Sequence, residues 1–147
     1  MSFLPIQRAL VMEEDKSTRL LITESLKNFG IPHVEDYADE ALALKRLLRG
    51  GFDLAILDLG IWSSPVAAAS PTLVIATSRT SAARDPEVTA RAQRLGADTL
   101  VEKPFTAWLL LRRLEVLLDT PAAKRLKIVE LHRDRFQLGV VREQRSI

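Results

Sequence analysis

Three absences narrow the possible functions of this 147-residue chain. It contains no cysteine, which excludes a disulfide scaffold, a thiol nucleophile and a metal site with cysteine ligands. No apolar run approaches the ~20 residues that a helix needs to cross a bilayer. The first residues also lack the basic and apolar regions of a secretory signal. We therefore expect a cytoplasmic protein that has no membrane partner.

The composition that remains predicts a compact domain with a basic extension. Hydrophobic residues make up 47% of the chain and charged residues 27%, which suits one domain with a substantial core. Residues 1–120 carry 14 basic and 16 acidic residues, whereas residues 121–147 carry seven basic and three acidic residues. The net charge therefore changes from −2 to +4 at Pro121, a residue that ends helices. We predict a domain over 1–120 and a helical extension over 121–147.

Short apolar runs alternate with segments of helical periodicity along the first part of the chain. The runs predict strands at 8–12, 33–38, 54–57, 72–76 and 99–101. The periodic segments predict helices at 16–29, 85–95 and 105–118, and one more that Asp39 caps and Gly50 with Gly51 closes. This order is typical of an α/β fold, in which right-handed crossovers join the strands of a doubly wound parallel sheet.

Polar residues follow four of the predicted strands at the point where each strand ends. They are two adjacent carboxylates, a third carboxylate, a hydroxyl and a lysine: Glu13 with Glu14, Asp58, Thr77 and Lys103. The carboxyl ends of parallel strands form one crevice, so these side chains can converge there. Three carboxylates in one crevice repel each other unless a cation lies among them, and oxygen ligands favour Mg²⁺. A lysine and a hydroxyl beside them suit a phosphoryl group.

These residues form an ordered set of motifs that resembles the receiver domain of bacterial two-component response regulators. The resemblance covers residues 7–119 and depends on Arg19 and on the segments 10–15, 53–59, 74–78 and 96–105. It implies a flavodoxin-like sheet with five strands in the order 2-1-3-4-5. It also implies a stand-alone response regulator of a phosphorelay that signals by protein contact and is not otherwise an enzyme.

The resemblance further implies a role for each site residue. Asp58 would accept a phosphoryl group from a sensor histidine kinase or a phosphotransfer protein. Thr77 would hydrogen-bond that group and Lys103 would pair with it. The bond between Lys103 and Pro104 would be cis, in a turn that aims the lysine.

The metal site that the resemblance implies uses oxygen ligands alone. Glu13, Glu14, Asp58 and the backbone carbonyl of Gly60 would hold Mg²⁺. The acidic pair of the family is usually Asp-Asp or Glu-Asp, whereas both positions are Glu here. The additional methylene group moves each carboxylate further into the crevice, and Mg²⁺ tolerates poor geometry badly.

Two further departures from the family affect switching and the third crossover. Leu100 occupies a position that is commonly Tyr or Phe, so a polar aromatic tip cannot move between solvent and core there. The interval from Asp58 to Thr77 is also about ten residues shorter than usual. The segment 59–71 contains two prolines and barely meets the dozen residues that a parallel crossover needs. We therefore expect the third helix to be shortened or missing.

A missing helix would leave one apolar face of the sheet thinly protected, and such a face binds a partner. We predict a homodimer that uses residues 121–147, residues 59–71 or both. Trp62 would anchor this contact or, as we favour, fill the gap that the helix leaves.

Two other functions stay open on sequence grounds. The first is a degenerate pseudo-receiver, which would be an interaction module that acts without phosphorylation. The second is a nucleic-acid-associated regulator that uses the basic extension. No helix-turn-helix pattern and no interleaving of aromatic and basic residues occur in 121–147, so we favour a solvated helix face over a nucleic-acid partner.

The homodimer prediction is tested by light scattering on the full chain and on a chain truncated before Pro121. We expect a dimer for the full chain and a lower association constant after truncation, because truncation removes one of the two proposed contact segments. A monomer in both cases would contradict the prediction.

Overall fold

The computed structural model describes residues 5–64, 66 and 73–120. The predicted helical extension over 121–147 and part of the segment 59–71 lie outside these residues, so the domain division and the dimer contacts stay predictions. Within the described residues, no helix has both the length and the apolar character needed to span a membrane.

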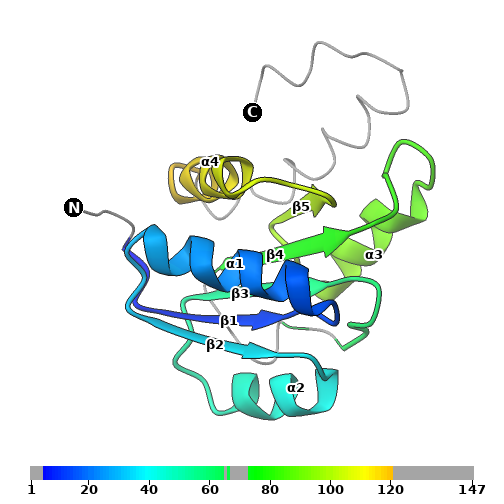
Figure 1. Cartoon of the computed structure of the whole chain (residues 1–147). Helices are drawn as coiled ribbons and strands as arrows, with labels where there is room; N and C mark the ends of the chain where they lie inside the picture. The colour runs from blue at the N-terminus through cyan, green and yellow to red at the C-terminus, as the bar shows by residue number, and fades with distance from the viewer. Residues whose placement is uncertain (1–4, 65, 67–72, 121–147) are drawn as a thin grey trace.

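Five parallel strands form one sheet in the order β2-β1-β3-β4-β5 (Figure 1). The strands are β1 (Arg8–Met12), β2 (His33–Tyr37), β3 (Leu54–Asp58), β4 (Leu73–Ser78) and β5 (Thr99–Glu102). Both the doubly wound fold class and the strand order expected from the sequence are confirmed. All side chains of β3 and β4 are buried, as expected for central strands that are covered on both faces.

Four helices connect or follow the strands: α1 (Lys16–Asn28), α2 (Glu40–Leu48), α3 (Glu87–Leu95) and α4 (Ala107–Leu118). Three of them are preceded by a capping residue whose side chain accepts a backbone N–H of the first turn. These residues are Asp15, Asp39 and Thr106. These bonds satisfy donors that the start of a helix leaves unpaired. Helix α3 ends at Gly96, whose φ of 94° is a conformation that glycine adopts without strain.

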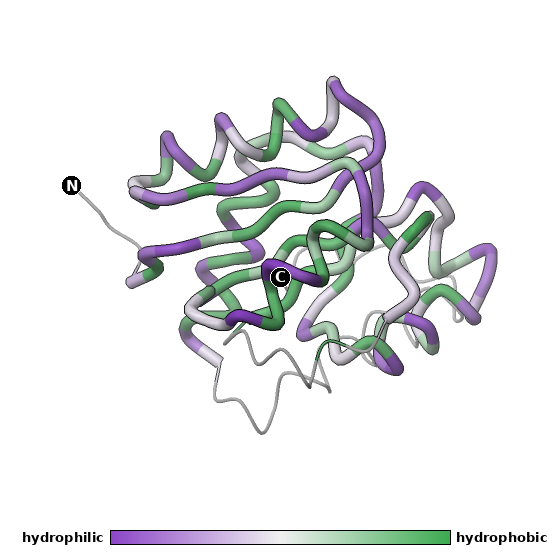
Figure 2. The backbone as a smooth tube through the Cα atoms, turned by 90° about the horizontal axis from the view of Figure 1, so that it is seen from below, coloured by the Kyte–Doolittle hydropathy of each residue, from purple (hydrophilic) through white to green (hydrophobic). Residues whose placement is uncertain are grey.

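The alternation of side chains along each strand divides the core into two layers. On one face, residues such as Val11, Ile56 and Ile75 pack with buried residues of α1 and α4. On the other face, residues such as Leu57 and Ala76 pack with buried residues of α2 and α3. Figure 2 shows hydrophobic residues along the strands that lie between these helices. The two layers fix which side of the sheet each residue at a strand end faces.

The connection from β3 to β4 contains no helix in its described residues, 59–64 and 66. Leu59, Trp62 and Val66 are instead fully buried in the layer beneath α2 and α3. The carboxylate of Glu40, at the start of α2, accepts the backbone N–H groups of Ser63 and Ser64, both at 2.9 Å. These contacts hold the short connection against the sheet.

The interpretation of Trp62 as a residue that fills the gap is therefore confirmed. The expectation that this face would be thinly protected is wrong for the described residues, because strand residues on it such as Leu57 and Ala76 are buried in the same layer as Trp62. The Nε1–H of Trp62 donates to the carbonyl of Ser64 at 2.6 Å, so the indole ring is buried with its polar atom satisfied.

We predict that Trp62→Ala lowers the free energy of unfolding by about 3–5 kcal/mol, because it leaves a cavity in the layer beneath α2 and α3. The matched control is Trp108→Ala, because the Trp108 side chain is 68% exposed on α4. That substitution should cost less than about 1 kcal/mol. Urea unfolding measures both values, and equal losses for the two variants would contradict the packing role of Trp62.

Candidate functional site

Four of the predicted site residues meet at the carboxyl edge of the sheet. Asp58 is the last residue of β3 and lies opposite Thr77 in the register of β3 with β4. Glu13 and Lys103 directly follow β1 and β5. All four are an even number of residues from core positions on the α1 and α4 face, for example Asp58 from Ile56 and Thr77 from Ile75. The two-residue period of a strand therefore brings them to the same side of the sheet.

The Lys103 ammonium lies between two buried carboxylates. Its Nζ is 2.8 Å from Glu13 Oε1 and 3.1 Å from Asp58 Oδ1. The Lys103 side chain is only 7% exposed, and Glu13 is 1% exposed. Because charges in such a place lose most of their hydration, each carboxylate depends on the ammonium for stabilisation. The three groups together carry a net negative charge when all are ionised.

Burial raises the pKa of the Glu13 carboxyl above its usual value of 4.5, and desolvation is the largest cause. The hydrogen bond from Lys103 and the backbone N–H of Asp15, 3.0 Å from Glu13 Oε2, oppose this rise. The negative charge of Asp58 adds to it. Glu13 therefore holds a proton more readily than an exposed glutamate does, and a nearby positive charge would favour its ionised form.

Thr77 and Gly60 complete the surroundings of Asp58. The Thr77 side chain is fully buried, and its Oγ1 has no hydrogen-bond partner among the described residues. A buried hydroxyl without a partner is costly, which indicates a place for a ligand atom. The Gly60 N–H donates to Asp58 Oδ1 at 2.9 Å. A Cβ atom at position 60 would lie 3.1 Å from that oxygen, so glycine permits this close turn.

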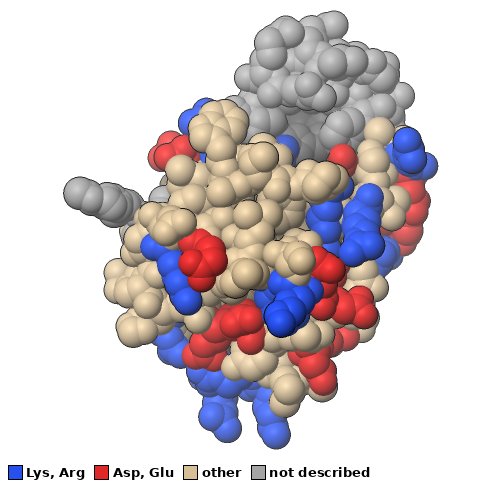
Figure 3. All heavy atoms as spheres, in the orientation of Figure 1, with Lys and Arg blue, Asp and Glu red and all other residues tan. Residues whose placement is uncertain are grey.

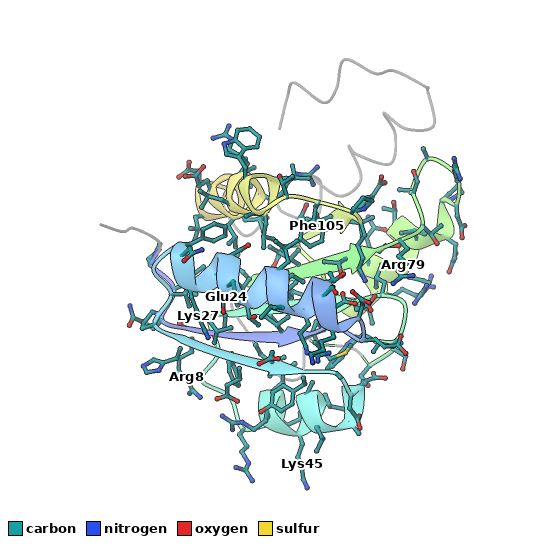
Figure 4. The ribbon with its side chains drawn as sticks, viewed as in Figure 1. Arg8, Glu24, Lys27, Lys45, Arg79 and Phe105 are labelled. Carbon is teal, nitrogen blue, oxygen red and sulfur yellow. The ribbon has the colours of Figure 1, made fainter. Side chains whose placement is uncertain are left out.

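A pocket of about 450 Å³ opens over these groups, and Glu13, Asp58, Gly60 and Lys103 line it. Its rim includes the exposed residues Glu14, Lys16 and Arg79 and the half-buried Arg91. Figure 3 shows acidic and basic side chains close together on the side toward which the strands point. Figure 4 places Arg79 at the edge of the sheet toward which the strands point. The pocket therefore combines buried acidic groups with a rim of acidic residues, Glu14 and Asp15, and basic residues, an arrangement that suits an anion held beside a cation.

Only some of the predicted metal ligands lie close together. Glu13 and Asp58 share the Lys103 contact, whereas Glu14 is exposed on the rim. No group of three or more acidic, histidine or cysteine side chains within the described residues is close enough to hold a metal ion. The available donors are nevertheless all oxygen atoms, which is the chemistry that Mg²⁺ prefers. The buried pair therefore fits a hard cation, and Lys103 would compete with it for both carboxylates.

Two outcomes concern residues near the site. The bond between Lys103 and Pro104 is cis, as the resemblance implied. Leu100 is buried, and it packs in the core layer of α2 and α3.

Sequence reasoning missed Arg79 and Arg91 as pocket residues. Arg79 could have been found, because it follows Thr77 by two positions beyond the end of a strand. Arg91 is in the middle of α3, and no local signal in the sequence marks it.

Solved structures of receiver domains match this fold over most of the chain. A CheY-like receiver domain protein from Methanospirillum hungatei is 20% identical, with a TM-score of 0.65 over 78% of this chain and 94% of that one. The chemotaxis regulator CheY4 of Vibrio cholerae is 22% identical, with a TM-score of 0.63 over 75% and 97%. The BeF3-activated receiver domain of DrrB, a Thermotoga maritima protein, is 24% identical, with a TM-score of 0.64 over 78% and 99%.

These structures define the class of fold to which the chain belongs. It has the fold of a CheY-like receiver domain of response regulators, and it aligns with nearly the full length of each of these three domains. No protein-family profile matches the sequence.

We predict that Lys103→Met lowers the free energy of unfolding by about 3–5 kcal/mol near neutral pH in the presence of a chelator, because two buried carboxylates lose their counter-charge. Removal of the ammonium raises the already elevated pKa of Glu13 further. The folded variant then binds protons more tightly than the unfolded chain, so its deficit should shrink as the pH falls toward 4.5. Urea unfolding across this pH range, with the exposed Lys45→Met as control, measures the effect; a deficit that does not depend on pH would contradict it.

Proposed function

We propose that this protein is a stand-alone response regulator in which Asp58 accepts a phosphoryl group from a phosphohistidine of a sensor kinase or phosphotransfer protein. The observation that carries the proposal is the arrangement around Asp58. The Lys103 ammonium is 3.1 Å from Oδ1, and the adjacent strand carries the buried hydroxyl of Thr77, which has no hydrogen-bond partner in the described part of the chain. A carboxylate and a cation in one pocket, with a hydroxyl donor on the adjacent strand, are groups that an acyl phosphate needs for its formation and stabilisation.

Each side chain has a distinct task in the transfer. A carboxylate oxygen of Asp58 attacks phosphorus, the bond from phosphorus to the histidine nitrogen breaks, and the imidazole leaves with the electron pair. Because Oδ1 already contacts Lys103 and the Gly60 N–H, Oδ2 is the oxygen that attacks. Lys103 and the Thr77 hydroxyl then stabilise the charge of the phosphoryl oxygens.

Mg²⁺ is the cation that this pocket would take. Glu13, Asp58 and the Gly60 carbonyl would hold it, with Glu14 reaching in from the rim. A bound Mg²⁺ would supply positive charge to the transferring oxygens. A second positive charge beside Glu13 would also stabilise its ionised form against the desolvation that raises its pKa.

The signal would leave the domain by protein contact. Phosphorylation adds negative charge to a buried pocket, and it can change the surface only by favouring one of two conformations. We propose no enzymatic activity beyond turnover of the protein's own acyl phosphate. A cytoplasmic location is part of the same proposal, since a sensor kinase phosphorylates its regulator inside the cell. A homodimer through residues 121–147 or 59–71 stays a separate prediction.

The alternative, a pseudo-receiver that binds partners without phosphorylation, is favoured by one observation. Lys103 contacts both buried carboxylates, and Glu14 is exposed, so the pair is neutralised in part without any metal. The phosphorylation experiment separates the two functions.

We predict that incubation with a small phosphodonor and Mg²⁺ adds one phosphoryl group to the protein, as detected by intact mass. Asp58→Asn and addition of a chelator should each abolish the modification, because they remove the acceptor and the cation. The matched control Asp119→Asn changes an exposed carboxylate at the end of α4 and should leave the modification intact.

Beryllofluoride provides a second readout, since it mimics an acyl phosphate. We expect Mg²⁺-dependent changes in the amide spectrum around Asp58, which Asp58→Asn removes. An unmodified protein together with an unchanged spectrum would reject the phosphorylated regulator and leave the pseudo-receiver.

A further inference from the structure

One arginine of α3 contacts the peptide group that lies directly beside Asp58. Arg91 Nη2 donates to the carbonyl oxygen of Leu59. The same peptide unit carries the N–H of Gly60, which donates to Asp58 Oδ1 at 2.9 Å. A continuous path of two hydrogen bonds through one peptide group therefore joins the guanidinium of α3 to the carboxylate of Asp58.

The short connection brings this peptide within reach of α3. The backbone N–H groups of Ile61 and Trp62 both donate to the Asp58 carbonyl, at 3.2 and 2.8 Å, so the chain turns tightly after β3. Trp62 then occupies the core where a longer connection would place a helix. Arg91 lines the pocket of Asp58 on one side and a second pocket of about 490 Å³, beside Trp62 and Arg94, on the other.

The charge of Arg91 affects the hydrogen bond that the Gly60 N–H donates to Asp58. A hydrogen bond from a guanidinium to a carbonyl is charge-assisted, and it polarises the peptide group that accepts it. Polarisation makes the N–H of Gly60 a stronger donor to Asp58 Oδ1. The same bond holds the peptide in place, so the Gly60 N–H points at the Asp58 carboxylate although residues 59–64 form no helix.

We propose that Arg91 is a positioning residue, which holds the Leu59–Gly60 peptide against Asp58 and transmits the chemical state of Asp58 to α3. The second half of this proposal rests on the proposed function. A phosphoryl group on Asp58 changes the charge that the Gly60 N–H meets. The peptide must then shift or weaken its bond to Arg91, and Arg91 is part of α3. Helix α3 also presents the exposed ion pair of Arg94 with Glu87, so a change in α3 reaches the protein surface.

The positioning role is tested without metal or phosphodonor, by NMR of the Gly60 amide. In Arg91→Ala, we expect the Gly60 amide proton to move upfield and to exchange faster with solvent, because its hydrogen bond weakens. Arg91→Lys keeps the charge and should restore part of the shift. The matched control Arg94→Ala removes an exposed arginine one helical turn away and should leave Gly60 unchanged.

Preserved amide dispersion in Arg91→Ala shows that the domain is folded, and Arg91→Lys provides the folded comparison if the alanine variant is not. An unchanged Gly60 resonance in the folded variants would overturn the positioning role.

The coupling role is tested with Mg²⁺ and beryllofluoride on the same four proteins. In the wild-type chain and in Arg94→Ala, we expect the amide resonances of α3 to move when beryllofluoride binds. In Arg91→Ala, the shifts around Asp58 should persist, while those of α3 should be lost. We also expect its phosphorylation by a small donor to be about tenfold slower, which corresponds to one hydrogen bond to a charged group.

The possible failures are distinguishable. If the wild-type chain does not respond to beryllofluoride, the proposed function and the coupling are both wrong, whereas the Gly60 resonance still decides the positioning role. If beryllofluoride binds and α3 responds equally in Arg91→Ala and the wild-type chain, only the coupling is wrong.

Discussion

The ion pairs of Lys103 with Glu13 and Asp58 are the constraint on which the arrangement of the site depends. They join the ends of β1, β3 and β5, and β4 lies between two of these strands. The Lys103 ammonium and both carboxylates lose most of their hydration there, so the ion pairs offset a desolvation cost that none of the three groups could bear alone. Glu13, Asp58 and Lys103 all line the pocket, so the interaction that stabilises the strand ends also defines the pocket.

The shortened third crossover links the stability of the domain to its chemistry. Trp62 is buried against the sheet in a connection whose described residues, 59–64 and 66, form no helix. The backbone N–H groups of Ile61 and Trp62 bind the carbonyl of Asp58 itself. A change in the packing of this segment therefore acts directly on the residue at the centre of the pocket. Arg91 of α3 contacts the carbonyl of Leu59, in the peptide that follows Asp58.

Much of the fold and half of the site could be predicted from local patterns. Strand runs, capping residues such as Asp15 and Asp39, and polar residues at strand ends are each encoded within a few positions. Which of the two adjacent glutamates is buried was not predictable in the same way, because their side chains are identical. Glu13 faces the core, whereas Glu14 is exposed on the rim. The strand period decides which of the two is buried, and the point where β1 ends decides how far that period continues.

The sequence by itself determined the order of the elements, the parallel sheet and the convergence of Glu13, Asp58, Thr77 and Lys103, since strand ends of a parallel sheet always meet at one edge. Only the tertiary structure decided that Lys103 bridges two carboxylates, that the Thr77 hydroxyl is left without a partner among the described residues, and that Arg91 contacts the peptide beside Asp58. These features depend on distances between residues far apart in the chain. Packing sets such distances, and no local pattern records them.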